Sequence, residues 1–395
     1  MILLSIIAIV FLLVFFTVLY VIFKKKIQYW IVSDMKRGLI NFVRPKPKNN
    51  IHIMFAFVDH FEPGSQGAGL EKQISSVEAW VRQYPELANR HKDRHGNPPQ
   101  HTFFFPPNRD VHRHLKRIVW LCSRGFGEVE MHLHHARQEP WPDDAASLRK
   151  KIHNCLDRYA EYGVFCLPDG QRAYGFIHGD WALANSRKGG KHCGVNDEIS
   201  ILVDTGCYAD FTFPVCNESQ PKMANTIFYG QSSPSFPKGY NKLCSPVEEG
   251  NANRNGLMFI QGVIGLRWKS KTHKILPSIE QSNISPSDVP LKKRIDYWVR
   301  KAIHVKGKPN WIFIKVHGHG ASEENREILQ GNLYDDMFSY LETKYNDGEK
   351  YSLHYVSARE MFNIVRAAEG GKSGDPDEYR DYKIPRYVYL PERPR

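Results

Sequence analysis

The chain has 395 residues, of which 42% are apolar and 24% are charged, and its formal net charge is +12. This composition excludes a disordered or fibrous protein and suffices for a large core. Eight Lys or Arg residues and one Asp lie within residues 1–50, so much of the excess charge is N-terminal rather than spread over a folded face. We therefore expect no nucleic-acid partner. The seven cysteines form no C-x-x-C pair, which argues against a disulfide framework or a zinc knuckle.

Residues 2–23 are an uncharged apolar run that, as a helix of about 33 Å, is long enough to cross a bilayer. No basic residue precedes it and KKK follows it, which favours a retained transmembrane helix over residues 1–23 rather than a cleaved signal peptide. The basic flank predicts a single-pass plasma- or inner-membrane protein with its following domain on the cytoplasmic face. Residues 24–50 are interpreted as a basic juxtamembrane linker, with lipid contact through residues 1–48.

Beyond the linker, short apolar runs alternate with helical patterns. Strands are expected at 51–57, 101–105, 129–134, 174–178, 199–203, 208–213, 257–264, 311–316 and near 353–356. Helices are expected near 71–94, 109–124, 144–162, 290–303 and 322–345. This alternation predicts parallel strands with crossover helices, in an α/β layered or barrel domain over residues 51–369. Residues 217–256 read as a loop insertion and 370–395 as an extended tail.

Chemistry-bearing side chains recur where the predicted strands end. They are Asp59, His60 and Glu62 after the first strand, His132 and His134 after the third, His178, Asp180, Trp181 and Asn185 after the fourth, and His317 and His319 after a late one. The carboxyl ends of parallel strands meet at one edge of a sheet. Because imidazole and carboxylate are the usual ligands of Zn²⁺ and similar ions, the pattern predicts a metal site there.

Strand periodicity refines this prediction. Residues two apart on a strand share a face, so His132 and His134 can chelate together, with Glu130 on the same side and His135 on the other. Cys193, Cys207 and Cys216 are expected to be buried small hydrophobic residues.

The order and spacing of these motifs resemble the NodB-like polysaccharide deacetylase superfamily over about residues 51–360. The similar segments are FVDH at 57–60, EVEMH at 128–132, the run 174–185, ISILVDTGCYADF at 199–211 and IKVH at 314–317. His60 stands where that family has a second aspartate, and His134 replaces a histidine that would fall on Ala136. A His-Gly-Asp-Trp run replaces the arginine of its third motif.

The resemblance implies a distorted (β/α) barrel that removes N- or O-acyl groups from a carbohydrate. His60, His132 and His134 would hold a divalent ion, with Zn²⁺ as the expected species. Asp59 or Glu62 would take the proton of water, and His317 or His319 would protonate the leaving group. The group expected to bind substrate comprises His178, Asp180, Trp181 and Asn185.

Two alternatives remain open from the sequence. A glycosidase on the same barrel would need a second carboxylate about 5–9.5 Å from Asp59, for which Asp180 and Asp210 are candidates. A catalytically inactive barrel would bind polysaccharide or act as a scaffold in polysaccharide biosynthesis or export machinery.

Overall fold

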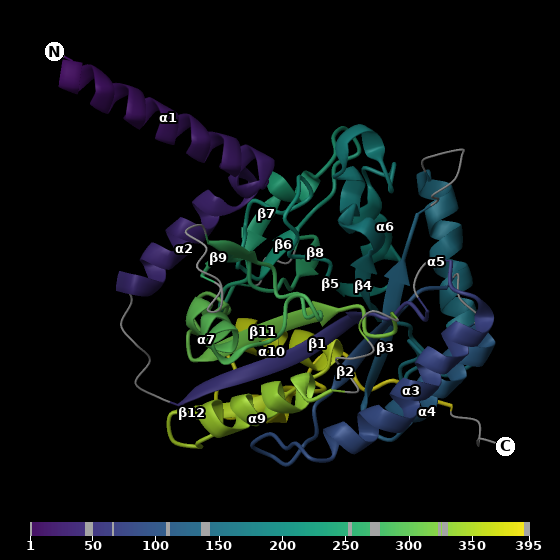
Figure 1. Cartoon of the computed structure of the whole chain (residues 1–395). Helices are drawn as coiled ribbons and strands as arrows, with labels where there is room; N and C mark the ends of the chain where they lie inside the picture. Colours follow the sequence, from purple (N-terminus) through teal and green to yellow (C-terminus); the bar gives the residue numbers. More distant parts are fainter. Residues whose placement is uncertain are drawn as a thin grey trace.

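The structure is a computed structural model that describes residues 2–43, 50–64, 67–107, 111–135, 143–251, 255–268, 277–322, 325 and 331–390. It is a mixed α/β molecule built around one large sheet, and its N-terminal helix α1 (Ile2–Lys24) projects away from the rest (Figure 1). Parts of the predicted helices at 109–124 and 322–345 fall on residues 109–110, 323–324 and 326–330, which lie outside the described residues.

The main sheet has ten strands in the order β11-β1-β2-β3-β4-β5-β8-β6-β7, with β12 also paired to β1. Its strands are β1 (Ile51–His60), β2 (His101–Phe105), β3 (Gly127–Leu133), β4 (Tyr174–His178), β5 (Cys207–Asp210), β6 (Phe228–Gly230), β7 (Cys244–Pro246), β8 (Leu257–Phe259), β11 (Trp311–Gly318) and β12 (Tyr351–Tyr355). All pairs from β11 through β8 are parallel, whereas β6 pairs antiparallel with both of its neighbours. Within the described residues the ladder does not run from β7 back to β11, so a closed barrel is not found.

Helices cover both faces of this sheet. They are α2 (Ile31–Val43), α3 (Leu70–Ala88), α4 (Lys116–Ser123), α5 (Ala145–Ala160), α6 (Glu198–Asp204), α7 (Lys292–Lys301), α9 (Leu333–Tyr345) and α10 (Ala358–Glu369). On one face, the ring of Phe57 in β1 lies 5.4 Å from that of Tyr334 in α9. On the other, Arg359 of α10 donates to Glu128 of β3 at 2.9 Å. Glu128 and His132 share that second face because they are four apart on one strand.

Short elements complete the chain. One- to two-turn segments lie at Ile27–Tyr29, Val111–Leu115, Gly179–Trp181, Leu183–Asn185, Lys188–Gly190, Gly239–Asn241 and Pro376–Tyr379, and a separate hairpin joins β9 (Gly265–Arg267) to β10 (Ser278–Glu280). The C-terminal segment from residue 370 runs over the surface. It is held to the domain by Tyr387, whose hydroxyl donates to the buried Glu130 at 2.8 Å.

Two sequence-based expectations differ from the structure. Residues 199–203, predicted as a strand, belong to helix α6. Its buried residues Ile199, Ile201 and Leu202 leave Val203 exposed, which is a helical rather than an alternating pattern. Residues 217–256 are not only a loop, because β6 and β7 within them extend the main sheet.

The juxtamembrane segment is also more ordered than a linker. Within it, α2 lies against the domain, where Asn225 donates to Asp34 at 2.8 Å and Lys301 forms an ion pair with the same carboxylate. Trp30 is buried beside Ile27, Ala224 and Ile264. Residues 27–41 are therefore part of the folded body.

One helix, Leu3–Lys24, is long and apolar enough to span a membrane by length and composition. None of the apolar stretch of this helix is buried against the rest of the molecule.

Candidate functional site: histidines at the carboxyl edge of the sheet

Histidines from three separate strands meet at the carboxyl edge of the sheet. His60 ends β1, and its ring centroid lies 4.9 Å from that of His132 in β3 and 6.0 Å from that of His317 in β11. His319, just beyond β11, stacks on His60 at 4.8 Å. The parallel register of β1 with β11 and of β2 with β3 brings these strand ends together, as the sequence pattern predicted.

Glu62, which follows β1, lies between two of the histidines. Its Oε1 is 3.0 Å from Nε2 of His132 and 3.0 Å from Nε2 of His134. These three side chains can direct one ligand atom each at a common point. We name them the open cluster, because the side chains of His134 and Glu62 are partly exposed, by 10% and 15%. His132 and His134 share a face as expected, and Glu62 rather than His60 completes the group of three.

The second ring nitrogen of each histidine also faces an oxygen. Nδ1 of His132 donates to the Ile177 carbonyl at 3.0 Å, and Nδ1 of His134 lies 3.2 Å from Oδ2 of Asp180. A neutral imidazole has one N–H, so it cannot donate to an oxygen on both sides. Burial lowers the pKa of His132 and favours that neutral form. A cation between the two Nε2 atoms and Glu62 resolves the conflict, so the residues present fit a divalent metal.

The pKa values of Glu62 in the open cluster and of the neighbouring His60 favour cation binding. Burial, together with His319 and His132, holds the pKa of His60 well below its usual range, so its imidazole is neutral. Burial alone would raise the pKa of Glu62, but the two imidazoles of His132 and His134 beside its Oε1 hold it well below its usual range. Neutral imidazoles and an ionised carboxylate are the ligand forms of these groups.

Asp59 lies away from the open cluster. It is fully buried, and its Oδ2 is 3.0 Å from Nε2 of His101 while its Oδ1 accepts from the Gly320 amide at 2.8 Å. Successive strand residues point to opposite faces, so Asp59 and His60 cannot both face the histidines. The structure thus places Asp59 as a tie between β1, β2 and the turn after β11, on the side of α3, where Trp80 donates to Gly320 O at 3.0 Å.

A cleft of about 740 Å³ lies beside the histidines. Its lining includes Trp181, His317, His319, Gln281, Asn283 and Ser285. Trp181 lies 5.7 Å from the ring of His60, so an aromatic face and several amide and hydroxyl groups flank the cluster. Nδ1 of His317 is buried without a hydrogen-bond partner, and burial holds the pKa of His317 well below its usual range.

The remaining predicted substrate-binding residues separate into two groups. Asp180 contacts His134 of the open cluster and Trp181 packs on His60 beside it, both with positive φ, 56° and 54°. Asn185 instead bonds within its own loop, donating to Asn196 Oδ1 at 2.8 Å and accepting from Gly194 N at 3.1 Å. His178 belongs to a second cluster, where it stacks on His135 at 4.7 Å.

Asp210, a candidate second carboxylate, does not reach the cleft. It is buried and accepts from the Thr212 hydroxyl at 2.6 Å, and burial raises its pKa to about 7. With Asp59 also buried elsewhere, the carboxylate pair that a glycosidase requires is not presented to the cleft by Asp59 and Asp210.

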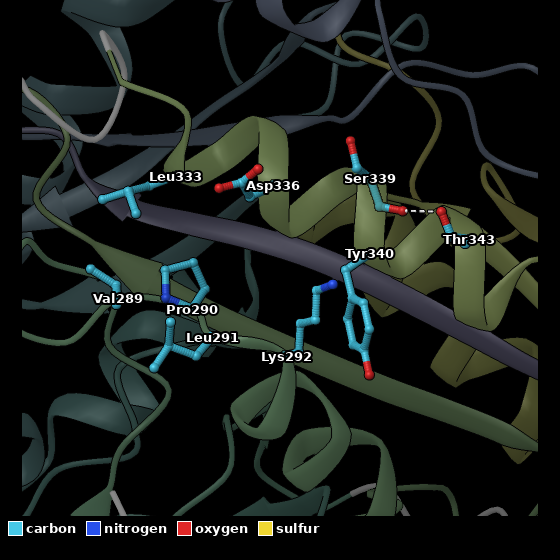
Figure 2. A pocket seen from close by; sticks show the side chains of 9 residues that line it. All are labelled: Val289, Pro290, Leu291, Lys292, Leu333, Asp336, Ser339, Tyr340 and Thr343. Atoms are coloured by element: carbon cyan, nitrogen blue, oxygen red, sulfur yellow. Dashed lines mark hydrogen bonds between the residues drawn. The ribbon is translucent and has the colours of Figure 1, made fainter. Parts of the chain in front are cut away.

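A different cavity, of about 480 Å³, lies between the start of α7 and helix α9 (Figure 2). Lys292 stands 5.4 Å above the Tyr340 ring at its wall. It shares no lining residue with the histidine cleft and contains neither histidine nor cysteine, so we assign it no part in the chemistry.

Comparisons with known proteins add little to this geometry. No family model and no curated protein matches the chain. Among solved structures, the 4-α-glucanotransferase from Thermococcus litoralis is similar at 13% identity over 79% of this chain, with a TM-score of 0.41. The match spans 40% of that enzyme's length, and at this score it carries no argument about function.

Proposed function

We propose that the chain is a membrane-anchored, metal-dependent hydrolase that removes N- or O-acyl groups from a carbohydrate. The observation that carries this proposal is the open cluster, in which Glu62, His132 and His134 each offer a ligand atom within 4.8 Å of the others. His60 connects this cluster to the cleft, because its ring packs on both His132 and the cleft residue His319. Two histidines and one carboxylate leave further coordination positions free, as catalytic zinc sites do. A bound ion supplies Lewis-acid chemistry, because it polarises an acyl carbonyl and makes water more acidic.

The protein's own residues handle the protons. His60 packs against His132 of the open cluster and against the cleft residue His319, so it is placed to accept a proton between them while Glu62 acts as a ligand. His319 lies at the cleft surface, where it can deliver a proton to a leaving amine or alcohol. His317, kept neutral by burial, is better suited to donating a hydrogen bond than to giving up a proton.

The cleft supports a polar, ring-shaped substrate. Trp181 offers an aromatic surface beside the histidines, and Gln281, Asn283 and Ser285 offer hydrogen-bonding groups along the same wall. A sugar combines apolar ring faces with hydroxyl edges, which this lining matches. The polysaccharide machinery that would use such a product stays a prediction from the sequence.

The N-terminal segments support anchoring. Four apolar residues on one side of α2, Val32, Met35, Leu39 and Phe42, are exposed, with Phe42 at 87%. Because α2 follows the spanning-length helix α1 and is fixed to the domain, this stripe would rest in the lipid surface. We keep the domain on the cytoplasmic face, as the basic flank indicates. A C-terminal reporter that is active only outside the cytoplasm would contradict this orientation.

The test uses the full chain purified in detergent with N-acetylated and O-acetylated oligosaccharides, measuring released acetate. We expect activity that a chelator abolishes and that Zn²⁺ or Co²⁺ restores. The double variant His132→Ala, His134→Ala should lose the metal of the open cluster, and its activity should fall by more than the roughly 10–100-fold that loss of a supporting partner costs. His153→Ala, on an exposed part of α5, is the matched control.

A second pair of variants separates ligand from base. Glu62→Gln should lower metal content, whereas His60→Gln should keep the metal and lose acetate release. Release of reducing sugar without acetate would instead favour a glycosidase. Sugar binding without any metal dependence would favour the inactive scaffold, and either result would overturn the proposal.

A further inference from the structure

A second group of side chains able to hold a metal lies beside the open cluster. Its residue His135 directly follows His134, the open-cluster histidine that contacts Asp180. The second group comprises His135, His178, Cys193 and Glu198, whose ligand atoms all lie within 4.8 Å of one another. We name it the closed cluster. All four side chains are buried, His135 with 4% and the other three with 0% exposed. They come from the end of β3, the end of β4, the following loop and the first residue of α6.

Glu198 is the centre of the closed cluster. Its Oε1 is 2.9 Å from Nε2 of His135 and 3.3 Å from Nε2 of His178, while its Oε2 is 3.3 Å from Sγ of Cys193. Four ligands around a tetrahedral zinc stand about 3.3–3.8 Å apart, so only small movements would bring these atoms onto one ion.

His178 is the member of this cluster whose hydrogen bonding is incomplete among the described residues. Its Nδ1 faces the Gly179 carbonyl and must donate to it, which leaves a lone pair on Nε2. That lone pair points towards the Glu198 carboxylate, and Nε2 is a buried atom without a hydrogen-bond partner. A lone pair facing a carboxylate in a dry interior is repulsive, and a metal ion between them makes both groups ligands.

The surroundings match the outer contacts that zinc ligands usually have. Nδ1 of His135 lies 3.2 Å from a carboxylate oxygen of Asp143, so each histidine turns Nε2 inward and Nδ1 to an outer acceptor. Sγ of Cys193 accepts from the amides of Asn185 at 3.3 Å and Val195 at 3.4 Å. Backbone N–H groups around sulfur stabilise the thiolate, the form that binds metal.

We propose that His135, His178, Cys193 and Glu198 form a closed, structural Zn²⁺ site. Four protein ligands fill a tetrahedral shell and leave no position for water, and all four residues are buried, whereas His134 and Glu62 of the open cluster are partly exposed. This site is independent of the proposed acyl-group hydrolysis, because it contains no residue of the open cluster and does not line the cleft.

The ion would brace the loop that forms one wall of the cleft. Between His178 and Cys193, five non-glycine residues have positive φ: Asp180, Trp181, Ala184, Asn185 and His192. Such backbone conformations persist only where the surroundings enforce them. Because His178 and Cys193 lie at the two ends of this loop, an ion bound to both would fix its conformation and hold Trp181 beside His60.

The test is X-ray absorption and cobalt spectroscopy on the full chain in detergent. Loaded with zinc, the wild type should bind two ions per chain, with sulfur at about 2.3 Å in the zinc shell. Loaded with cobalt, it should show a thiolate-to-cobalt charge-transfer band. The His132→Ala, His134→Ala variant should keep one ion and the whole band, so failure of the open cluster and failure of the closed cluster are distinguishable.

Two cysteine variants complete the test. Cys193→Asp keeps an anionic ligand, so it should hold cobalt and lose the charge-transfer band. Cys207→Ser, at another buried cysteine, should leave the band unchanged. A wild-type zinc shell without sulfur, or a band that survives Cys193→Asp, would overturn the proposal. The wild-type spectra decide the matter even if Cys193→Asp fails to fold.

Discussion

Two neighbouring residues, His134 and His135, lead into clusters of opposite character. His134 contacts Glu62 and Asp180 next to a cleft, whereas His135 contacts Glu198 and Asp143 with no exposed side. Both clusters combine histidine with carboxylate, but only the closed cluster adds a thiol and a fourth protein ligand. The two clusters therefore differ more in solvent access than in the types of their ligands. Solvent access suits the open cluster to catalysis, and its absence suits the closed cluster to a structural role.

The largest effect is expected in the closed cluster. In chelator-treated protein, Glu198→Gln should lower the free energy of unfolding by about 3–5 kcal/mol, because it removes the charge that His135 faces in a dry interior. Chemical denaturation monitored by circular dichroism measures this, with Glu86→Gln on the exposed side of α3 as the control. Equal stability in the two variants would show that the closed cluster does not hold the fold together.

A buried lysine near His317, Lys315, predicts a pH effect on stability. Lys315 shares a face with His317, donates to the Phe213 carbonyl at 2.7 Å, and burial lowers its pKa to about 7. The unfolded chain keeps this proton up to a pKa of about 10.4, so between those pKa values unfolding takes up a proton and wild-type stability rises with pH.

Lys315→Met should abolish that rise. Relative to this variant, the wild type should gain about 2–4 kcal/mol between pH 7 and pH 10, because this pH range covers only part of the difference between the folded and unfolded pKa values. Denaturation at both pH values measures the difference, with the exposed Lys150→Met as control. A difference that does not change with pH would contradict a neutral, buried Lys315.

A smaller effect is expected at Asp59, the residue that the sequence offered as a base. Asp59→Asn should lower the free energy of unfolding by about 1–3 kcal/mol, because it weakens the contacts with His101 and the Gly320 amide. Acetate release should fall much less than in His60→Gln. Complete loss of activity with stability and metal unchanged would restore Asp59 as the base.

The strand ends and their histidines could be predicted because the signal is local. An apolar strand followed by His or Asp indicates where the carboxyl edge lies, and alternation predicted the shared face of His132 and His134. The same alternation, applied to Asp59 and His60, would have placed Asp59 on the far face. Glu62 was available as a candidate, but nothing in its spacing ranked it above His60 as a ligand.

The closed cluster could not be predicted because its parts are far apart in the chain. Cys193 is a single cysteine in a loop, which in isolation indicates only a buried side chain. Glu198 precedes an apolar, β-branched run that resembles a strand, and only the folded α6 turns this carboxylate towards His135 and His178. Seven residues are too few for helical periodicity to outweigh that composition.

The most direct measurement of the central claim is the rate of zinc release from the full, zinc-loaded chain to a coloured chelator. We expect two ions per chain, one released rapidly from the open cluster and one released from the closed cluster only as the protein unfolds. The rapid phase should vanish in the His132→Ala, His134→Ala variant, and the slow phase should become rapid in Cys193→Asp. Release of both ions at one rate, or a rapid phase that survives the double variant, would contradict the account.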